Sequence, residues 1–319
     1  MTTDTLGRRL FTYAVITDTH LNQGEEECNS PFEVNKLANG RMRHVVRDLN
    51  TREVDFVLHL GDLLHPVPHI PHLYEQAAQC FKDQVKDLRH KLYVVPGNHD
   101  VGDKPVDWCP AGMVRDEFLA LWAEHFGPNY QAFDHGGVRF ILMDAQIINS
   151  GLAAEAEQKA WVEGELAAAK AAGQRVFLNI HYPPYLTYPD EDEHYDNIGE
   201  PGRSWLLGLM EKHRVEALFA GHVHNFWYHR HDATQCWLLP STAFVRQDYS
   251  EMYRAAPPPE FEAGRNDWNK LGYFIVHVHE NGHLCDIVRT YGAVVEPGAP
   301  VAAVPDTVAP VHPLQSPVT

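Results

Sequence analysis

Residues that bind metals or transfer protons cluster in five short motifs of this sequence. They are Asp18 and His20 in TDTH, Asp62 and His65 in HLGDLLH, Asn98, His99 and Asp100 in VPGNHD, His181 in NIHYPP, and His222 and His224 in AGHVH. Taken singly, each motif could be a turn, a cap or a strand end. Together they indicate one shared cause, because carboxylate, amide oxygen and imidazole are ligands for iron, manganese, zinc or cobalt. The motifs carry no thiolate, which argues against a structural zinc site.

The spacing inside two of the motifs suggests how they deliver their ligands. Residues i and i+2 of an extended segment point the same way, so Asp18 with His20, and His222 with His224, can face one pocket. Glycines at 61, 97 and 221 stand beside the motifs and let the backbone turn sharply. We expect these glycines to make room for two cations.

Each motif follows an apolar run, which places it at the end of a strand. The predicted strands are 11–17, 54–60, 91–95, 137–143, 175–180 and 215–220, followed after residue 221 by 226–231, 235–239, 272–279 and 283–290. The predicted helices lie near 33–50, 70–89, 114–125, 155–172 and 203–213. Alternating β and α elements followed by β alone predict an α/β fold, a layered sandwich with mixed β-sheets in one domain. Open α/β sheets bind ligands at the carboxyl ends of their strands, so the metal site is expected there.

Length and composition bound the remaining organisation. The 319 residues fit one metallo-domain over 1–292, β-rich from about 222, with a Pro/Ala-rich tail over 293–319 that is expected to be extended or disordered. A net charge of −17 disfavours nucleic acid and anionic membranes as partners. The sequence contains no apolar stretch of the ~20 residues that span a bilayer. Five scattered cysteines predict reduced thiols in a cytoplasmic protein, and formation of a homo-oligomer is an open alternative.

At these motifs the sequence resembles the calcineurin-like metallophosphoesterase superfamily, whose signature of Asp-x-His, Gly-Asp, Gly-Asn-His-Asp/Glu, a lone His and Gly-His-x-His occurs here in order across about residues 11–290. The resemblance implies a four-layer α-β-β-α sandwich with two mixed β-sheets, and two metal ions, of iron, manganese or zinc. It assigns Asp18, His20 and His224 to one ion, Asn98, His181 and His222 to the other, and Asp62 to both.

The resemblance also implies a reaction and two catalytic residues. Two ions lower the pKa of a bridging water, and the resulting hydroxide attacks phosphorus. His99 would contact the phosphate and protonate the leaving oxygen, and Asp100 would orient His99. His65 stands three residues after the bridging Asp62, where purple acid phosphatases have a tyrosine ligand, so a purple iron centre is not expected. His65 is either a substrate contact or a residue behind the ligands.

The order and spacing are most similar to bacterial phosphodiesterases that act on cyclic nucleotides and glycerophosphodiesters, so a small phosphodiester is the expected substrate. A phosphomonoesterase is the nearest alternative, and a non-phosphate bond stays open as a target. A non-catalytic scaffold would show decayed ligands, and none of the seven is replaced here. The Gly-Asp-x-x-His form also occurs in nucleases of the family, but the acidic charge argues against a polymer.

Several segments outside the motifs have open roles. The loops 181–197 and 240–254 could approach the substrate, and the acidic run 190–193 either attracts a cationic head group or is simply solvated. The segment 65–72, with His65, His69 and His72, is more plausibly a stiff proline-rich loop than a third metal site. Residues 256–269 resemble a surface loop. Arg203 and Arg246 stay outside the predicted site, because single arginines most often form surface ion pairs.

Overall fold

The computed structural model describes residues 5–25, 27–30, 32–246 and 265–290. Its strands are β1 (Arg9–Ile16), β2 (Phe56–His59), β3 (Lys91–Val94), β4 (Gln131–His135), β5 (Val138–Leu142), β6 (Arg175–Ile180), β7 (Ala217–Ala220), β8 (Trp227–His231), β9 (Thr234–Leu238), β10 (Gly272–His279) and β11 (Gly282–Arg289). Its helices are α1 (Ala38–Leu49), α2 (Pro71–Val85), α3 (Asn98–Val101), α4 (Asp116–Phe126), α5 (Ala153–Ala171) and α6 (Gly202–His213), with short 3-10 turns at Glu33–Leu37 and Trp268–Lys270.

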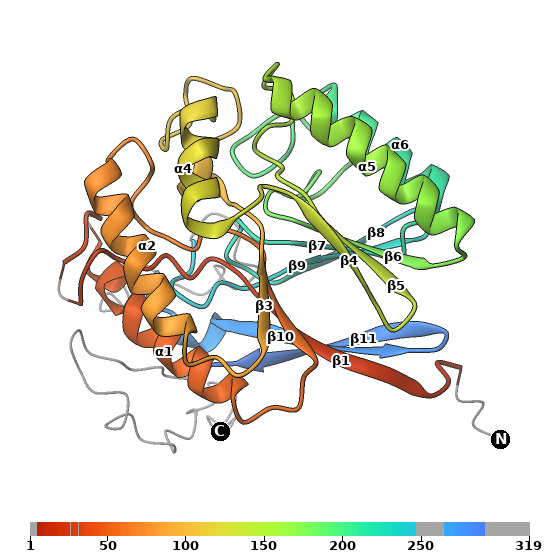
Figure 1. Cartoon of the computed structure of the whole chain (residues 1–319), viewed down its shortest axis with the longest axis horizontal. Helices are drawn as coiled ribbons and strands as arrows, with labels where there is room; N and C mark the ends of the chain where they lie inside the picture. The colour runs from red at the N-terminus through yellow and green to blue at the C-terminus, as the bar shows by residue number, and fades with distance from the viewer. Residues whose placement is uncertain (1–4, 26, 31, 247–264, 291–319) are drawn as a thin grey trace, which may run out of the picture.

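The strands form two mixed sheets. One sheet has the order β11-β10-β1-β2-β3. Strands β1, β2 and β3 are parallel to one another, and β10 runs antiparallel to both of its neighbours, β1 and β11. The other has the order β4-β5-β6-β7-β9-β8, with parallel strands β5, β6, β7 and β9 between antiparallel edges. Helices α1 and α2 cover the outer face of the first sheet, and α5 and α6 that of the second (Figure 1). The predicted four-layer α-β-β-α sandwich is therefore confirmed.

Three apolar clusters hold these layers together. The central cluster joins the inner faces of the two sheets and is rich in rings, among them Tyr13, Phe140 and Phe177. A second cluster packs α1 and α2 on the first sheet, and a third packs α5 and α6 on the second. Because most strands are buried on both faces, they read in sequence as continuous apolar runs.

The strand register determines where the polar motifs come together. Ile16 at the end of β1 lies opposite His59 at the end of β2, and His59 lies opposite Val94 at the end of β3. In the second sheet, Ile180 of β6 lies opposite Ala220 of β7. Parallel neighbours that end at the same level release their loops at the same edge, so five motifs reach one edge of the sandwich.

One strand of the structure was not predicted from the sequence, and two predicted segments lie partly or wholly outside the described residues. Strand β4 was not among the predicted strands; each of its residues but one is half-buried, so its sequence carries no clear apolar run. The predicted surface loop 256–269 lies mostly outside the described residues, and the predicted tail 293–319 lies wholly outside them. Among the described helices, none is both long and apolar enough to cross a membrane.

Candidate metal centre

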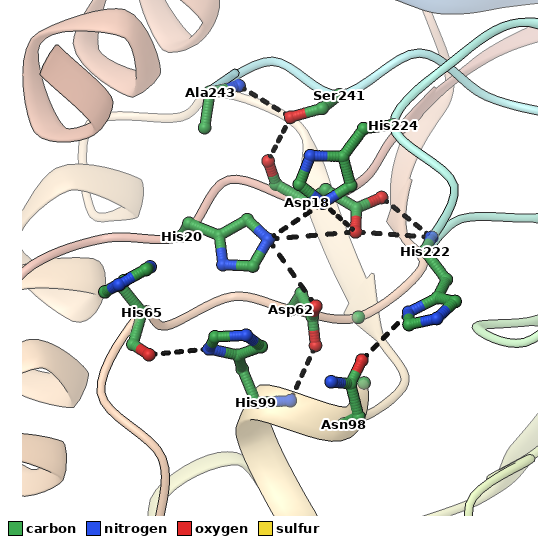
Figure 2. Close-up of polar contacts among 12 residues, drawn as sticks. Asp18, His20, Asp62, His65, Asn98, His99, His222, His224, Ser241 and Ala243 are labelled. Atoms are coloured by element: carbon green, nitrogen blue, oxygen red, sulfur yellow. Dashed lines mark hydrogen bonds and ion pairs between the residues drawn. The ribbon is translucent and has the colours of Figure 1, made fainter. Parts of the chain in front are cut away.

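The seven predicted ligands lie together at the carboxyl edge of the two sheets and are almost completely buried. Figure 2 shows all of them except His181. They come from the loops after five strands: Asp18 and His20 after β1, Asp62 after β2, Asn98 after β3, His181 after β6, and His222 and His224 after β7. Backbone hydrogen bonds join the loops, including those from Asp18 N–H to the Gly61 carbonyl and from His20 N–H to the Asp62 carbonyl, both at 3.0 Å. The site is therefore part of the fold's hydrogen-bonded framework.

One group of possible ligand atoms belongs to Asp18, His20, Asp62 and His224, which lie within 4.8 Å of one another. The Nε2 atoms of His20 and His224 are 3.1 Å apart. The Nε2 of His224 is 3.2 Å from the Oδ1 of Asp18, and the Nε2 of His20 is 3.5 Å from the Oδ2 of Asp62. We call this group the first cluster.

A second group within the same distance contains Asp62, His181 and His222. The Oδ1 of Asn98 joins it, 3.1 Å from the His181 Nε2 and 3.0 Å from the His222 Nδ1. The Asp62 Oδ2 is 3.4 Å from the His181 Nε2. This second cluster therefore shares Asp62 with the first cluster, through the same oxygen.

The donor chemistry of the two clusters fits metal ions. In the first cluster two imidazole nitrogens face each other at 3.1 Å beside two carboxylates, an arrangement that a cation satisfies better than a proton. In His181 and His224 the other nitrogen, Nδ1, lies 2.8 Å from a backbone carbonyl, of Leu60 and Phe244 respectively. With that proton placed on Nδ1, the lone pair of each Nε2 points into the clusters, as a ligand requires.

The pKa values of the cluster reflect its crowded charges. Burial lowers the pKa of His181, but the Asp62 and Asp18 carboxylates outweigh burial and raise it to about 9. Burial raises the pKa of Asp62, but His181 and His99 together lower it by more than burial raises it, so the net shift is downward. Burial, followed by electrostatic repulsion from the neighbouring His99 and His224, lowers the pKa of His20 well below its usual value. Asp62 therefore remains a carboxylate that attracts positive charge.

The backbone of the ligand loops differs from the extended geometry expected from the i and i+2 spacing. Asp18, His20, Asp62, His222 and His224 all have positive φ, between 45° and 69°. This left-handed conformation is unusual for residues that carry a side chain and is typical of functional sites, where the surrounding structure enforces it. Asp18 and His20 do reach one cluster, and His222 and His224 do line one pocket, but through turns and not through strands.

The glycines beside the motifs permit contact between neighbouring loops. A Cβ at Gly221 would collide with the Thr17 hydroxyl and lie 2.9 Å from the Asp18 Oδ2, and a Cβ at Gly97 would collide with Asp62. These glycines were expected to make room for the ions. In the structure they make room for the adjoining loop instead, and this close contact brings the ligands of the two loops together.

His99 and Asp100 separate in the structure. The His99 Nδ1 lies 2.6 Å from the His65 carbonyl, and the ring borders a pocket beside the clusters. The Asp100 carboxylate instead accepts hydrogen bonds from the backbone N–H groups of Gly97, Leu63 and Leu64. Asp100 therefore makes no direct hydrogen bond to the His99 ring: its buried carboxylate ties the Gly-Asp loop to the Gly-Asn-His loop, and the His65 carbonyl contacts the ring. The expected orienting role of Asp100 stays a prediction, acting through the backbone of the loop that carries His99.

His65 lies on the open side of the first cluster. Its ring centre is 5.6 Å from that of His20 and 5.3 Å from that of His99, and possible ligand nitrogens of the three rings lie within 4.8 Å of one another. Burial lowers the pKa of His65 to about 3, so the ring is neutral at pH 7. Exposed His69 instead places its Nδ1 3.3 Å from the Ala111 carbonyl, and the grouping of His65, His69 and His72 does not form.

The pocket beside the clusters has a volume of about 340 Å³. Predicted residues on its wall are His20, Asp62, His65, His99, His222 and His224, and residues that the motifs did not reveal are Asn29, Ser30, Phe32, Asn35, Pro110, Tyr195, Phe244, Arg246 and Arg265. The motif signals could not find the second set, because its members come from loops without a metal-ligand spacing.

The two candidate substrate loops meet in the part of the chain that the structure describes. Asp196 of the first loop forms an ion pair with Arg246 of the second, next to His222. Arg246 thus belongs to the pocket, whereas Arg203 pairs with Glu200 away from it. In the acidic run, Glu191 accepts hydrogen bonds from backbone N–H groups of its own loop, and Glu193 forms an ion pair with Lys104. These two carboxylates therefore hold the loop in place.

Comparison with known proteins agrees with this geometry. The sequence model of the calcineurin-like phosphoesterase family matches residues 11–226. The mouse serine/threonine-protein phosphatase CPPED1 is 29% identical over 185 residues, which are 56% of each chain, so the chain spans about half the length of this relative. A probable glycerophosphodiester phosphodiesterase, GpdQ of Arcobacter nitrofigilis, is 27% identical over 221 residues, or 66% of this chain and 70% of its own.

The fold also has a counterpart among solved structures. A dimetal phosphatase from zebrafish (Danio rerio) superposes with a TM-score of 0.60 at 14% identity, and the match covers 89% of this chain and 97% of the zebrafish chain. At that identity the likeness concerns the fold alone. Because the family's sequence model matches residues 11–226, well over half of the sequence, this chain belongs to the calcineurin-like phosphoesterase family.

Proposed function

We propose that this protein is a two-metal phosphohydrolase that cleaves a small phosphodiester, with Asp18, His20 and His224 holding one ion, Asn98, His181 and His222 the other, and Asp62 both. The observation that carries the proposal is the position of one carboxylate oxygen. The Asp62 Oδ2 lies 3.5 Å from the His20 Nε2 and 3.4 Å from the His181 Nε2, between the two clusters. A shared carboxylate is what a pair of closely spaced ions requires.

The ions, when bound, supply an acidified water and neutralise charge on the phosphate oxygens. The chain's own residues position the rest of the reaction. His99 N–H donates to the Asp62 Oδ1 at 2.8 Å through the backbone, which holds His99 beside the shared carboxylate. Because the His65 carbonyl fixes the His99 Nδ1, the Nε2 is the ring nitrogen available to give a proton to the departing oxygen.

Size and charge of the pocket support a small diester. About 340 Å³ is enough for a small ligand, and Phe32 and Phe244 give the wall apolar surface for an ester group. The charge of Arg246 is balanced by Asp196, so the pocket is less positive than a phosphomonoester dianion favours. The net charge of −17 supports a small substrate over a nucleic acid.

A phosphomonoesterase is the second candidate. It is favoured by the presence of two arginines, Arg246 and Arg265, on the pocket wall, and by the phosphatase name of the mouse relative. Arg265 stacks over the ring of Phe32, 3.8 Å from its centre, so its charge lies at an aromatic surface. A dianionic phosphate would need both arginines to turn toward the ions.

A matched pair of substrates tests the proposal. Protein loaded with manganese, zinc or iron is assayed with bis-p-nitrophenyl phosphate and p-nitrophenyl phosphate, which release the same leaving group. We expect kcat/KM for the diester to be at least about tenfold higher, which corresponds to 1.4 kcal/mol in transition-state binding. A preference for the monoester would overturn the diester assignment, and no turnover of either compound would overturn the phosphohydrolase.

A further inference from the structure

The ligand histidines differ in what holds the nitrogen that faces away from the clusters. His181 and His224 use backbone carbonyls, of Leu60 and Phe244. His222 instead presents its Nε2 to a side chain, with the Oδ1 of Asp196 at 3.3 Å. Backbone partners are part of the fold, whereas a side-chain partner can be changed without altering the chain path.

Asp196 is well suited to fix the His222 ring. Its carboxylate is 1% exposed and is held by the guanidinium of Arg246, which also donates to the His222 carbonyl at 3.2 Å. The Asp196 Oδ1 lies 3.3 Å from the Nε2 without the geometry of a hydrogen bond, and a small turn of the ring would let it accept the Nε2 proton. The Nδ1, 3.0 Å from the Asn98 Oδ1, would then be the nitrogen that faces the second cluster. Carboxylate–histidine pairs of this kind orient ligands at metal sites.

The neighbouring residue acts on another ligand of the same cluster. The Tyr195 hydroxyl accepts a hydrogen bond from the Asn98 Nδ2 at 3.1 Å. With the amide nitrogen held there, the Oδ1 of Asn98 points toward His181 and His222. The Tyr195 ring also packs against the His222 ring, with centres 4.7 Å apart, and lies under Arg246 at 4.8 Å.

The first cluster is supported by other elements. The Asp18 carboxylate accepts the His222 backbone N–H at 3.0 Å and the Thr17 hydroxyl at 2.7 Å. The Ser241 hydroxyl donates to the Asp18 carbonyl at 2.8 Å and accepts the Ala243 N–H, as Figure 2 shows. These supports come from the loops after β1, β7 and β9, and none of them uses Tyr195 or Asp196.

We propose that Tyr195 and Asp196, clamped by Arg246, are positioning residues that set the affinity of the second metal site independently of the first. The inference rests on the two-metal centre of the proposed function. It assigns to the loop after β6 a purpose that its sequence did not reveal: adjacent side chains orient two ligands from different strands.

Metal binding measures this directly. The full-length protein is stripped with a chelator and titrated with Mn²⁺, and the two dissociation constants are obtained by calorimetry, with elemental analysis giving the bound stoichiometry. In Asp196→Ala we expect the dissociation constant of the ion at the second cluster to rise by about 10–100-fold, the usual effect of losing such a partner. The other ion should bind within about twofold of wild type, because the partners of Asp18 and His224 are unchanged.

Further variants separate positioning from simple loop stability. Asp196→Asn keeps an acceptor for the His222 Nε2 proton and should restore part of the affinity, and Tyr195→Phe should weaken the same ion by a smaller factor. Asp192→Ala and Tyr188→Phe alter exposed residues of the same loop and should bind both ions as wild type does.

The outcomes are distinct. Equal loss of both ions in Asp196→Ala, or unchanged binding of both, would overturn the positioning role. A wild-type protein that binds fewer than two ions would instead overturn the two-metal function.

Discussion

At the carboxyl ends of the strands, buried Asp18 and Asp62 face a group of histidines, whereas at the opposite ends a half-buried carboxylate is balanced by charge within the protein. There, Glu216 before β7 accepts hydrogen bonds from Arg175 of β6 at 2.5 and 2.6 Å, and His283 of β11 lies 2.8 Å from it. Arg175 also donates to the Gly282 carbonyl at 2.9 Å, so the three residues connect the two sheets. One end of the sandwich is complete as folded, and the other is arranged to receive cations. Stability and chemistry thus depend on opposite ends of the same strands.

The largest effect is expected at the shared carboxylate. Asp62→Asn removes the charge common to both clusters and should lower kcat/KM by at least about 1000-fold, because metal ions contribute several kcal/mol and each 1.4 kcal/mol is tenfold. Elemental analysis should show loss of bound metal in parallel. Asp192→Asn, on an exposed loop position, is the control, and an active Asp62→Asn protein would refute the role of this end.

Substitution of His99 tests whether the metal end of the molecule also supplies a general acid. His99→Ala should lower kcat by about 100-fold or more with an alkyl leaving group, within the usual range of general acid catalysis. The loss should be much smaller with p-nitrophenolate, which departs without a proton. His69→Ala removes an exposed histidine and should leave both rates unchanged. Equal losses with both leaving groups would contradict the acid role.

Gly221 tests how tightly the two sheets meet at the metal end. Gly221→Ala would push a methyl group into Thr17 and Asp18 and should lower the free energy of unfolding by about 1–3 kcal/mol, as overpacking does. Gly164→Ala is the matched control, because its added Cβ would meet no described atom within 4 Å apart from its own stretch of helix, and in helix α5 alanine should stabilise by about 0.5–1 kcal/mol. Chemical denaturation measures both. A Gly221→Ala protein as stable as wild type would show that the loops can separate.

The smallest effect is expected at the opposite end and depends on pH. Burial raises the pKa of Glu216, but Arg175 and His283 outweigh burial and hold it at about 2, below its usual 4.5. Its contribution to stability is therefore complete above about pH 4.5, declines as the pH falls, and is lost near pH 2. Glu216→Gln should cost about 1–2 kcal/mol at pH 7 with little change in kcat, and the difference from wild type should shrink in acid.

Denaturation at several pH values measures the Glu216 effect, with Glu157→Gln at an exposed position of α5 as the control. A pH-independent difference would contradict the depressed pKa. A large loss of activity would contradict the separation of the two ends.

Much of this organisation follows from sequence patterns. Strand β6 has the predicted bounds, and the five motifs converge because apolar runs identify buried parallel strands and the polar residues follow them. Sequence spacing could not reveal the left-handed backbone at Asp18 or His222, because that conformation is imposed by contacts between loops. Nor could it place Tyr195 and Asp196, whose partners Asn98 and His222 lie far away in the chain.

The left-handed backbone at the ligand residues has a consequence for how this protein can change. Such a conformation costs on the order of 1–3 kcal/mol for a residue with a side chain, and glycine would relieve it. Relief of this strain would therefore favour glycine at His20 or His222, whose side chains donate no hydrogen bond to the backbone of another loop in the described part of the chain, and each replacement would erase a ligand. Variants that gain thermal stability at these positions should lose metal and activity, so heat resistance and metal binding are opposed at this edge of the molecule.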